Sequence, residues 1–198
     1  MLFYALRTIE SVESIVETVI AVPAGMETQA RAIVIEAGLR TPVKLAPGGS
    51  ERQDSVRIAL ELTSAESDLV IVHDAARPFA ARRIFEACLE NASRAGGAIA
   101  AVPVSDTLKR AEGKTISATV ARDNLWQAQT PQAFRRELLI RAHQRAAADG
   151  IAATDDADLV ERLGAKVEIV EGAATNLKIT TRADLELAEA LARSGFVG

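Results

Sequence analysis

The sequence predicts an α/β fold, with helices on both faces of a doubly wound, mainly parallel sheet. In the first half of the chain, short apolar runs alternate with amphipathic stretches. This alternation is typical of βαβ units. Polar and charged residues also follow the ends of several apolar runs, which is where open α/β sheets bind ligands. The length of 198 residues suits one domain over residues 1–198.

The first half of the chain supplies the predicted core of the sheet. Residues 2–16 resemble a helix, although a nucleotide-binding fold usually opens with a strand and a glycine-rich turn. Further helices are expected at 27–37, 51–62 and 80–91, and strands at 18–24, 41–45, 68–73 and 97–104. Ser50 is the expected N-cap of the helix at 51–62, because Gln53 follows it at capping-box spacing.

The second half begins with a change of pattern. Residues 105–124 are polar, alternate without a helical stripe and surround Gly113, so we expect a protruding β-arm at about 105–125. Residues 129–132 are interpreted as an extended turn, because Pro131 keeps Thr130 out of helical geometry. Helices at 135–148, 156–163 and 181–193 and an edge strand at 165–170 follow. Thr154 and Thr181 are the expected N-caps of the last two helices, with Asp184 completing the second cap.

Composition excludes several classes of function. The formal net charge is −4 without a basic block, which disfavours a nucleic-acid partner. No apolar run approaches the ~20 residues of a membrane span, and no signal peptide opens the chain. Cys88 is the single cysteine and only two histidines occur, so a disulfide and a zinc site are not expected. These features favour a cytoplasmic protein.

Asp74 is the sharpest candidate for chemistry. It ends the apolar run of the segment VIVHDAARP, and Arg77 lies three residues further on. An acid at a strand end can hold a divalent metal beside phosphates or accept a hydrogen bond from a sugar. Arg77 can offer a forked donor to a phosphate. An equally weighted alternative is that Asp74 caps the next helix and pairs with Arg77.

Two other segments are weaker candidates by themselves. Gly48 and Gly49 free the backbone for close approach to a ligand ahead of a helix N-terminus, with Ser55 one turn further on. Alone, this pattern favours an ordinary turn. Lys178 lies between Leu177 and Ile179, where burying an ammonium is costly without an anion. A snorkelling lysine on an edge strand is the alternative, but the position favours a ligand-facing role.

Six motifs in order resemble one family. VHDAARP, GG-x-x-R-x-x-S-V, DT-x-K, TPQ, TD-[DE]-A and N-x-K-[IV]-T, at their spacings in this sequence, resemble 2-C-methyl-D-erythritol 4-phosphate cytidylyltransferases. The resemblance spans nearly the whole chain. It implies a Rossmann-like nucleotidyltransferase of isoprene biosynthesis that transfers a cytidylyl group from CTP to methylerythritol phosphate and releases pyrophosphate, with Mg2+ bridging the phosphates.

The resemblance also implies roles for individual residues. Asp74 and Lys178 would serve both CTP binding and catalysis, with Asp74 also the candidate metal ligand. Arg122 would orient the sugar phosphate for attack. In this family the arm crosses to a second subunit, which implies a homodimer in which the arm completes the neighbour's site. The remaining expected contacts are Gly49, Ser50 and Ser55 to CTP, and Arg77, Thr107, Thr130 and Thr154 to the sugar phosphate.

The sequence departs from the family at its start. Members begin with an apolar strand and a glycine-rich loop that carries an Arg, with a Lys shortly after, and this sequence shows neither. We therefore expect that roughly 30 residues, one βα unit, are missing, and that the chain as given is weak or inactive. The alternatives are a ribitol 5-phosphate or other polyol-phosphate cytidylyltransferase, and a non-catalytic dimerising nucleotide-binding domain.

Overall fold

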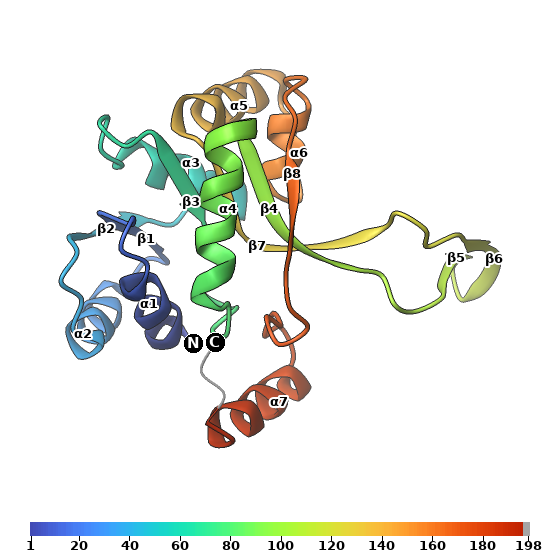
Figure 1. Cartoon of the computed structure of the whole chain (residues 1–198), viewed down its shortest axis with the longest axis horizontal. Coiled ribbons are helices and arrows are strands. Elements are labelled where there is room, and N and C mark those ends of the chain that lie inside the picture. The colour runs from blue at the N-terminus through green and yellow to red at the C-terminus, as the bar shows by residue number, and fades with distance from the viewer. Residues whose placement is uncertain (196–198) are drawn as a thin grey trace.

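The computed structural model describes residues 1–195 and confirms the α/β fold (Figure 1). The first half comprises α1 (Leu2–Ser11), β1 (Thr18–Val22), α2 (Glu27–Ala37), β2 (Val43–Pro47), α3 (Arg52–Glu61), β3 (Leu69–Val72), α4 (Arg82–Ala95) and β4 (Gly97–Pro103). The second half comprises β5 (Leu108–Glu112), β6 (Thr115–Val120), β7 (Trp126–Arg135), α5 (Arg136–Asp149), α6 (Asp156–Glu161), β8 (Glu168–Glu171) and α7 (Arg182–Arg193).

Two of the three expected helix caps are wrong. Glu51 occupies the N-cap position of α3 without a side-chain cap bond, and the Ser50 hydroxyl donates to the Asp54 carboxylate at 2.6 Å instead. The α6 cap is Asp155, whose carboxylate accepts from the Asp158 amide, and not Thr154. A carboxylate is a stronger acceptor than a hydroxyl. Asp155 therefore accepts from the Asp158 amide, and Asp54 accepts from the Ser50 hydroxyl. At α7 the predicted capping box is confirmed.

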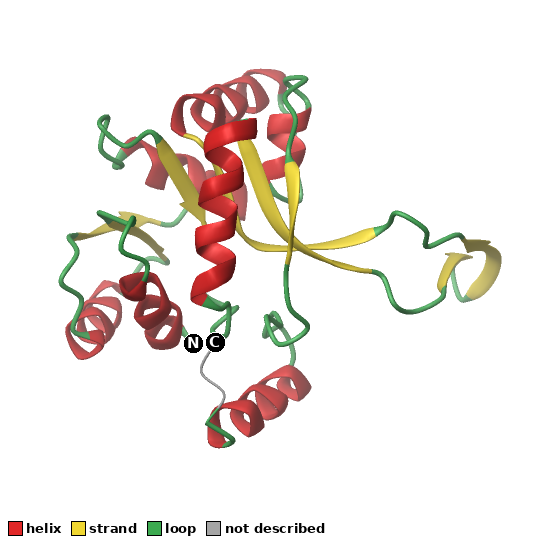
Figure 2. Ribbon diagram, viewed as in Figure 1, coloured by secondary structure: helices red, strands yellow, loops and turns green. Residues whose placement is uncertain are grey.

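The larger sheet has the strand order β3-β7-β4-β8 and is mixed (Figure 2). β7 runs antiparallel to both β3 and β4, whereas β8 is parallel to β4. The prediction of an extended turn at residues 129–132 is therefore wrong, because these residues lie inside a central strand. The extended backbone that a proline demands also suits a strand at a bulge. Residues 129–131 oppose Ala100 alone, where the register with β4 shifts.

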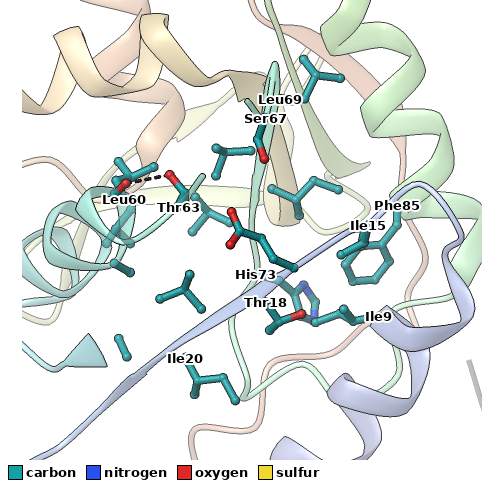
Figure 3. A pocket seen from close by; sticks show the side chains of 18 of the residues that line it. Ile9, Ile15, Thr18, Ile20, Leu60, Thr63, Ser67, Leu69, His73 and Phe85 are labelled. Atoms are coloured by element: carbon teal, nitrogen blue, oxygen red, sulfur yellow. Dashed lines mark hydrogen bonds between the residues drawn. The ribbon is translucent and has the colours of Figure 1, made fainter. Parts of the chain in front are cut away.

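β1 and β2 form a separate, parallel two-stranded sheet. A cavity of about 640 Å³ lies between β1 and β3, and it is lined by residues of both strands and of the helices around them (Figure 3). Packed protein interiors contain few voids much larger than a water molecule. The two sheets are therefore held apart at this place by a space that the described residues do not fill.

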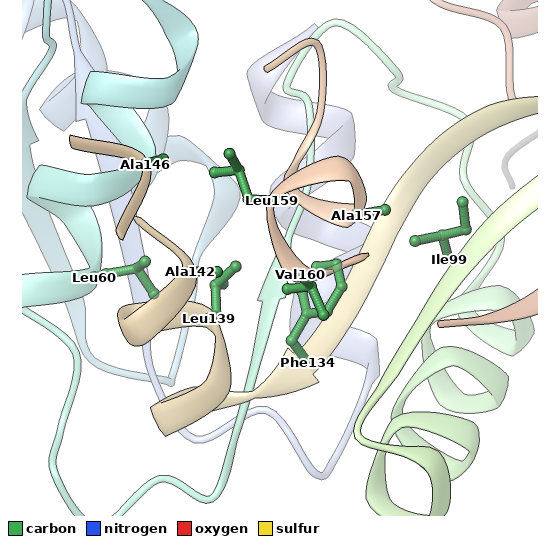
Figure 4. Packing of buried hydrophobic residues seen from close by; sticks show 9 residues of the cluster. All are labelled: Leu60, Ile99, Phe134, Leu139, Ala142, Ala146, Ala157, Leu159 and Val160. Carbon is green, nitrogen blue, oxygen red and sulfur yellow. The ribbon is translucent and has the colours of Figure 1, made fainter. Parts of the chain in front are cut away.

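Buried side chains lie on both faces of the larger sheet. Ile99 and Phe134 point to the face covered by α3, α5 and α6, where the cluster in Figure 4 packs. Their neighbours Ala98, Ala100 and Ala133 point to the opposite face, against Ile84, Cys88 and Ala92 of α4. This alternation is the period of two that strands impose. The sheet is consequently covered by packed side chains on both faces.

The predicted arm is confirmed as an antiparallel ribbon of β5 and β6, which protrudes from the sheet (Figure 1). Its residues are almost all exposed, including Ile116, which has an exposed fraction of 62%. A two-stranded ribbon is marginal in isolation.

In residues 1–195, no helix is both long and apolar enough to cross a membrane.

Candidate active site

Asp74 follows β3 and receives hydrogen bonds from two cations. Its Oδ1 accepts from Arg52 Nε at 3.1 Å, and its Oδ2 lies 2.9 Å from Lys178 Nζ. Arg77 Nε is farther, at 4.0 Å. Asp74 does not cap α4, which begins at Arg82 with Ala81 as its N-cap. The capping part of the alternative is therefore wrong, its pairing with Arg77 is present at 4.0 Å, and the closer partners of Asp74 come from segments distant in sequence.

Arg52 joins Asp74 to a buried acid. Its NH1 atom donates to Asp156 Oδ2 at 2.8 Å, and the Asp156 side chain is 1% exposed. Asp156 Oδ1 in turn lies 2.9 Å from Nε2 of the equally buried His143. A buried carboxylate requires partners of this kind. The chain of contacts from His143 through Asp156 and Arg52 therefore anchors Asp74 to the core beneath α5.

The charge of Asp74 is maintained by these partners. Burial alone would raise its pKa, but the hydrogen bond from Lys178 and the positive charge of Arg52 hold the pKa below its ordinary value. Lys178 is 42% exposed and Asp74 14%. One face of the pair is thus open to solvent, and an anionic ligand reaching Lys178 would compete with Asp74 for the ammonium.

Thr130 fixes the backbone of Asp74 from β7. Its Oγ1 accepts from the Asp74 amide at 3.0 Å and lies 3.0 Å from His73 Nδ1. His73 Nε2 lies 3.1 Å from the Arg77 carbonyl, which can only accept. The ring therefore carries its proton on Nε2 and accepts from the Thr130 hydroxyl at Nδ1. With an exposed fraction of 4%, Thr130 is engaged in positioning Asp74.

The glycine loop packs tightly against the start of α3. The Gly49 amide donates to Ser55 Oγ at 3.0 Å, and Ser55 Oγ donates to the Glu51 carbonyl at 3.1 Å. A Cβ atom at Gly49 would lie 2.2 Å from Asp54 Cβ, so a side chain there has no room. The structure thus brings together Gly49, Ser50 and Ser55 at one helix N-terminus, which is linked to Asp74 through Arg52.

A second loop delivers Lys178. Asn176 is fully buried, and its side-chain Nδ2 donates to the Thr130 carbonyl at 2.9 Å and to Gln129 Oε1 at 3.0 Å. Arg77 NH1 donates to the Asn176 carbonyl at 2.8 Å. Residues 176–180 form no strand, so the edge-strand alternative for Lys178 is wrong. The bulge of β7 turns Gln129 and Thr130 toward this loop and so holds Lys178 beside Asp74.

The arm residues lie apart from this centre within one chain. Leu108 pairs with Val120, so Thr107 and Arg122 flank the same end of the ribbon, and both are exposed. Figure 2 shows the ribbon well away from the loops after β3 and β8. Thr154, just ahead of α6, is exposed as well. The structure therefore gathers the predicted nucleotide contacts and leaves the predicted sugar-phosphate contacts Thr107 and Arg122 on a separate surface.

Sequence reasoning missed the anchor residues of the site. The sequence patterns indicate no role for Arg52, Asp156, His143 and Gln129, although Arg52 stands within the glycine-loop motif and Asp156 within TD-[DE]-A. The signal for Arg52 was an arginine in the first turn of a helix, where a cation is disfavoured by the helix dipole unless acids face it. Asp156 is 104 residues from Arg52, and no sequence spacing indicates that contact.

Asp74 is the carboxylate available to a divalent metal at this centre. Within residues 1–195, no three His, Cys, Asp or Glu side chains are grouped so that they could hold an ion. Mg2+ is usually bound through one or two carboxylates together with substrate phosphates and waters. The described residues do not form a complete metal site on their own, but they would fit a magnesium ion that entered with a nucleotide and took Asp74 as a ligand.

A glycine loop at a helix N-terminus, an acid after a strand and a lysine on a neighbouring loop define a nucleotidyltransferase of the α/β class. The family model of 2-C-methyl-D-erythritol 4-phosphate cytidylyltransferase (IspD) matches residues 1–194. The chain belongs to this family.

Known relatives agree with the family match. The 2-C-methyl-D-erythritol 4-phosphate cytidylyltransferase of Bacillus velezensis is 43% identical over 195 residues, which are 98% of this chain and 84% of that protein. The Deinococcus radiodurans enzyme of the same name is 49% identical over 175 residues, 88% of this chain and 71% of that protein. The alternative of a polyol-phosphate enzyme is not favoured by these matches.

Solved structures support the same fold. The 2-C-methyl-D-erythritol 4-phosphate cytidylyltransferase of Thermus thermophilus superposes with a TM-score of 0.84 at 40% identity, covering 96% of this chain and 87% of that chain. The 4-diphosphocytidyl-2C-methyl-D-erythritol synthase of Anaerococcus prevotii has a TM-score of 0.89 at 28% identity and covers 97% of this chain and 85% of that one.

Proposed function

We propose that the chain transfers the cytidylyl group of CTP to 2-C-methyl-D-erythritol 4-phosphate. A phosphate oxygen of the sugar phosphate forms a bond to the α-phosphorus, the bond from that phosphorus to the bridging oxygen breaks, and pyrophosphate leaves. The product is 4-diphosphocytidyl-2-C-methyl-D-erythritol. Family membership gives the reaction, and the observation that supports it here is the Asp74–Lys178 pair, which Arg52 links to the helix that follows the glycine loop.

The residues at this centre act through position and charge. Negative charge accumulates on the phosphate oxygens as the bond to pyrophosphate breaks, and preorganised cations stabilise it. Lys178 is the cation that can move from Asp74 to a phosphate, because it is the more exposed of the two partners. The amides at the start of α3 and the Gly49 backbone would hold the nucleotide without any side chain in the way.

Magnesium would be held by Asp74 and would neutralise the triphosphate when bound. Arg52 would keep the Asp74 carboxylate turned toward the ligand while Lys178 is released from it. Asp74 thereby retains Arg52 as a cationic partner when the nucleotide binds, and the charge of Asp74 remains balanced as Lys178 leaves.

We place the reaction in the cytoplasm, in agreement with the buried free thiol of Cys88.

The sugar-phosphate contacts are assigned to a second copy of the chain. Thr107 and Arg122 are exposed on the arm and lie apart from Asp74 of the same chain. A homodimer in which each arm reaches the partner's Asp74 would complete both sites, and exchange of an arm is an established route to symmetric pairs. The arm's exposed Ile116 is the kind of residue that such a contact would bury.

Product formation tests the proposal. The chain is incubated with CTP, Mg2+ and methylerythritol phosphate, and the cytidine diphosphate product is followed by chromatography. The assay uses enzyme at a concentration close to that of the substrates, so that slow turnover is also detected. Lys178→Ala should reduce the rate on the order of 10²–10³-fold, as for other transition-state donors.

Lys166→Ala is the matched control, because Lys166 is exposed and precedes the amino end of β8, whereas Lys178 follows its carboxyl end. It should leave the rate unchanged. Ribitol 5-phosphate offered in place of methylerythritol phosphate should give little product. Equal rates for the two lysine variants, or a preference for ribitol 5-phosphate, would contradict the proposal. Calorimetric titration with CTP and Mg2+ shows separately whether the nucleotide binds.

A further inference from the structure

The cavity between β1 and β3 has a sheet edge on each side. In the larger sheet β3 is hydrogen-bonded to β7 on one side, and in the smaller sheet β1 is hydrogen-bonded to β2 on one side. Thr18, Val19, Ile20 and Ala21 line the cavity from one side, and residues 69–72 line it from the other. The second backbone edge of each strand therefore borders the cavity, and buried backbone groups without partners are costly.

The strands that flank the cavity point in the same direction. β1 is parallel to β2, and β2 leads through the glycine loop to α3, whose Arg52 reaches Asp74 at the end of β3. The carboxyl ends of β1, β2 and β3 consequently lie at one edge of the molecule. A strand placed between β1 and β3 could pair with both in parallel register and join the two sheets into one.

The cavity walls are mainly apolar on both faces of this gap, with Glu17, Glu66 and Asp68 among the polar residues that also line it. Ile9 of α1 and Phe85 of α4 stand on one face, and Leu60 of α3 on the other, as Figure 3 shows. A parallel strand buried on both faces reads as a continuous apolar run. The lining thus specifies an occupant with backbone donors and acceptors and with apolar side chains on both sides.

We propose that the cavity is an acceptor slot for one extended apolar polypeptide segment, which binds as a parallel strand between β1 and β3. Backbone hydrogen bonds to both edges would give affinity, as in other cases of strand addition. Apolar side chains would fill the space of about 640 Å³. A small apolar molecule would fill the volume but leave both backbone edges unpaired, so a peptide strand is the better complement.

The geometry also says how such a segment could be joined to the chain. Tyr4, near the start of α1, lies 6.2 Å from the ring of Phe79, which follows β3. α1 therefore starts at the carboxyl edge of the strands and returns the chain to the beginning of β1. A strand in the slot that continued into α1 would form a βαβ unit, whose connection is right-handed in nearly all proteins.

A synthetic peptide tests the slot without any use of enzymatic activity. The peptide carries a run of valine, isoleucine and alanine as long as the five residues of β1 and is flanked by lysines for solubility. At about 100-fold excess over its Kd it should raise the Tm of the full chain by roughly 5–10 °C. Hydrogen exchange should slow at the amides of β1 and β3 and not at those of the arm.

Two matched controls separate strand pairing from hydrophobic contact. The same peptide with alternate residues N-methylated loses backbone donors, as proline does, and should bind at least tenfold more weakly. Ala21→Phe places a large side chain in the slot and should prevent binding, whereas Ala32→Phe on the exposed surface of α2 should not. Circular dichroism confirms that each variant is folded before the titration.

Several outcomes would overturn the proposal. These are equal binding of the N-methylated peptide, protection that maps outside β1 and β3, and binding that Ala21→Phe leaves unchanged. Sedimentation that shows copies paired through β1 and β3 without peptide would assign the slot to a second copy instead. If the chain alone is not cooperatively folded, it is refolded with the peptide or with the same strand fused ahead of Met1, and failure of both to restore cooperative unfolding also overturns the proposal.

Discussion

At the scale of single residues, Arg52 has the most consequential position. It spans the half-buried Asp74 and the fully buried Asp156 with hydrogen bonds of 3.1 and 2.8 Å. Truncating it would leave a carboxylate buried beside His143 without a counter-charge. Removing one partner of a buried pair is far more costly than losing a surface pair. The residue therefore serves both the stability of the α3–α6 contact and the orientation of Asp74.

Arg52→Gln should lower the free energy of unfolding by about 1–3 kcal/mol, the range for a buried acceptor left unsatisfied, since Arg52 is itself partly exposed. It should also lower kcat more than it changes KM, because Asp74 loses its orientation. Arg57→Gln, on the same helix, removes an exposed pair with Glu61 and should change stability by less than about 0.5 kcal/mol. Urea unfolding and steady-state kinetics check both variants. Equal effects of the two substitutions would contradict this role for Arg52.

His73 predicts a dependence of stability on pH. Burial lowers its pKa from 6.5 to about 4, despite the neighbouring Asp74 charge and the contact with the Arg77 carbonyl. The unfolded chain therefore binds the proton more readily between these two values. Stability from neutral His73 is complete above pH 6.5 and is lost as pH falls toward 4, to a total on the order of 3 kcal/mol.

His73→Gln keeps a donor and an acceptor but cannot titrate. Its free energy of unfolding should fall less between pH 7 and pH 5 than that of the parent chain, by about 2 kcal/mol. Denaturant unfolding at these two pH values measures the difference. If the free energy of unfolding falls equally with pH in the two proteins, His73 is not the source of the acid sensitivity.

Asp74 could be predicted from the sequence because an acid directly after an apolar run stands at the ligand-binding edge of an α/β sheet. Lys178 could be predicted because a lysine within an apolar stretch needs an anion nearby. The contacts that hold Asp74 and Lys178 in place could not be predicted from the sequence. Arg52 meets Asp156 across 104 residues, and Asn176 meets Thr130 across 46. Such contacts depend on how the sheet brings distant loops to one edge, which local patterns do not encode.

At the scale of elements, the loop before α3 has no tolerance for a side chain. Gly49→Ala would place Cβ within 2.2 Å of Asp54 Cβ and 2.9 Å of the Asp54 carbonyl carbon. Because the second contact is with backbone, the loop must shift. The Gly49 amide would then lose its bond to Ser55.

We expect Gly49→Ala to weaken CTP binding at least tenfold, or about 1.4 kcal/mol, while the rest of the fold remains intact. Calorimetric titration of the variant against CTP with Mg2+ measures this. Gly113→Ala in the turn of the arm is a useful comparison, since a Cβ there meets nothing within 4 Å but is strained by a φ of +62°. It should leave CTP affinity unchanged. Loss of affinity in both variants would point to a general defect instead.

β7 shows why element prediction failed at one place and succeeded at another. The segment WQAQTPQAFR contains a proline and three glutamines, and its apolar alternation is interrupted at Thr130 and Pro131. Its strand character comes from two neighbours that pair with it, β3 and β4. The arm, in contrast, is a local hairpin around Gly113, so its polar alternation was sufficient to predict it.

At the scale of the whole molecule, the α/β class could be predicted because each βα unit carries its own pattern. The separation of the strands into two sheets could not be predicted from the sequence. It arises from the cavity between β1 and β3, and the residue pattern of neither strand indicates that cavity. The mixed direction of the larger sheet could not be predicted either. β7 reverses the local order only after the arm has carried the chain out and back.

The arm has a consequence for inheritance and assay design. If each site takes Asp74 from one chain and Arg122 from another, a defect in either residue affects a different half of the site. Chains with Asp74→Asn and chains with Arg122→Ala would each be inactive alone. Mixed and allowed to exchange, half of the pairs would be heterodimers, each with one site free of both substitutions, so about a quarter of the parental activity should return. Two damaged copies of one gene could thus support a function that neither provides.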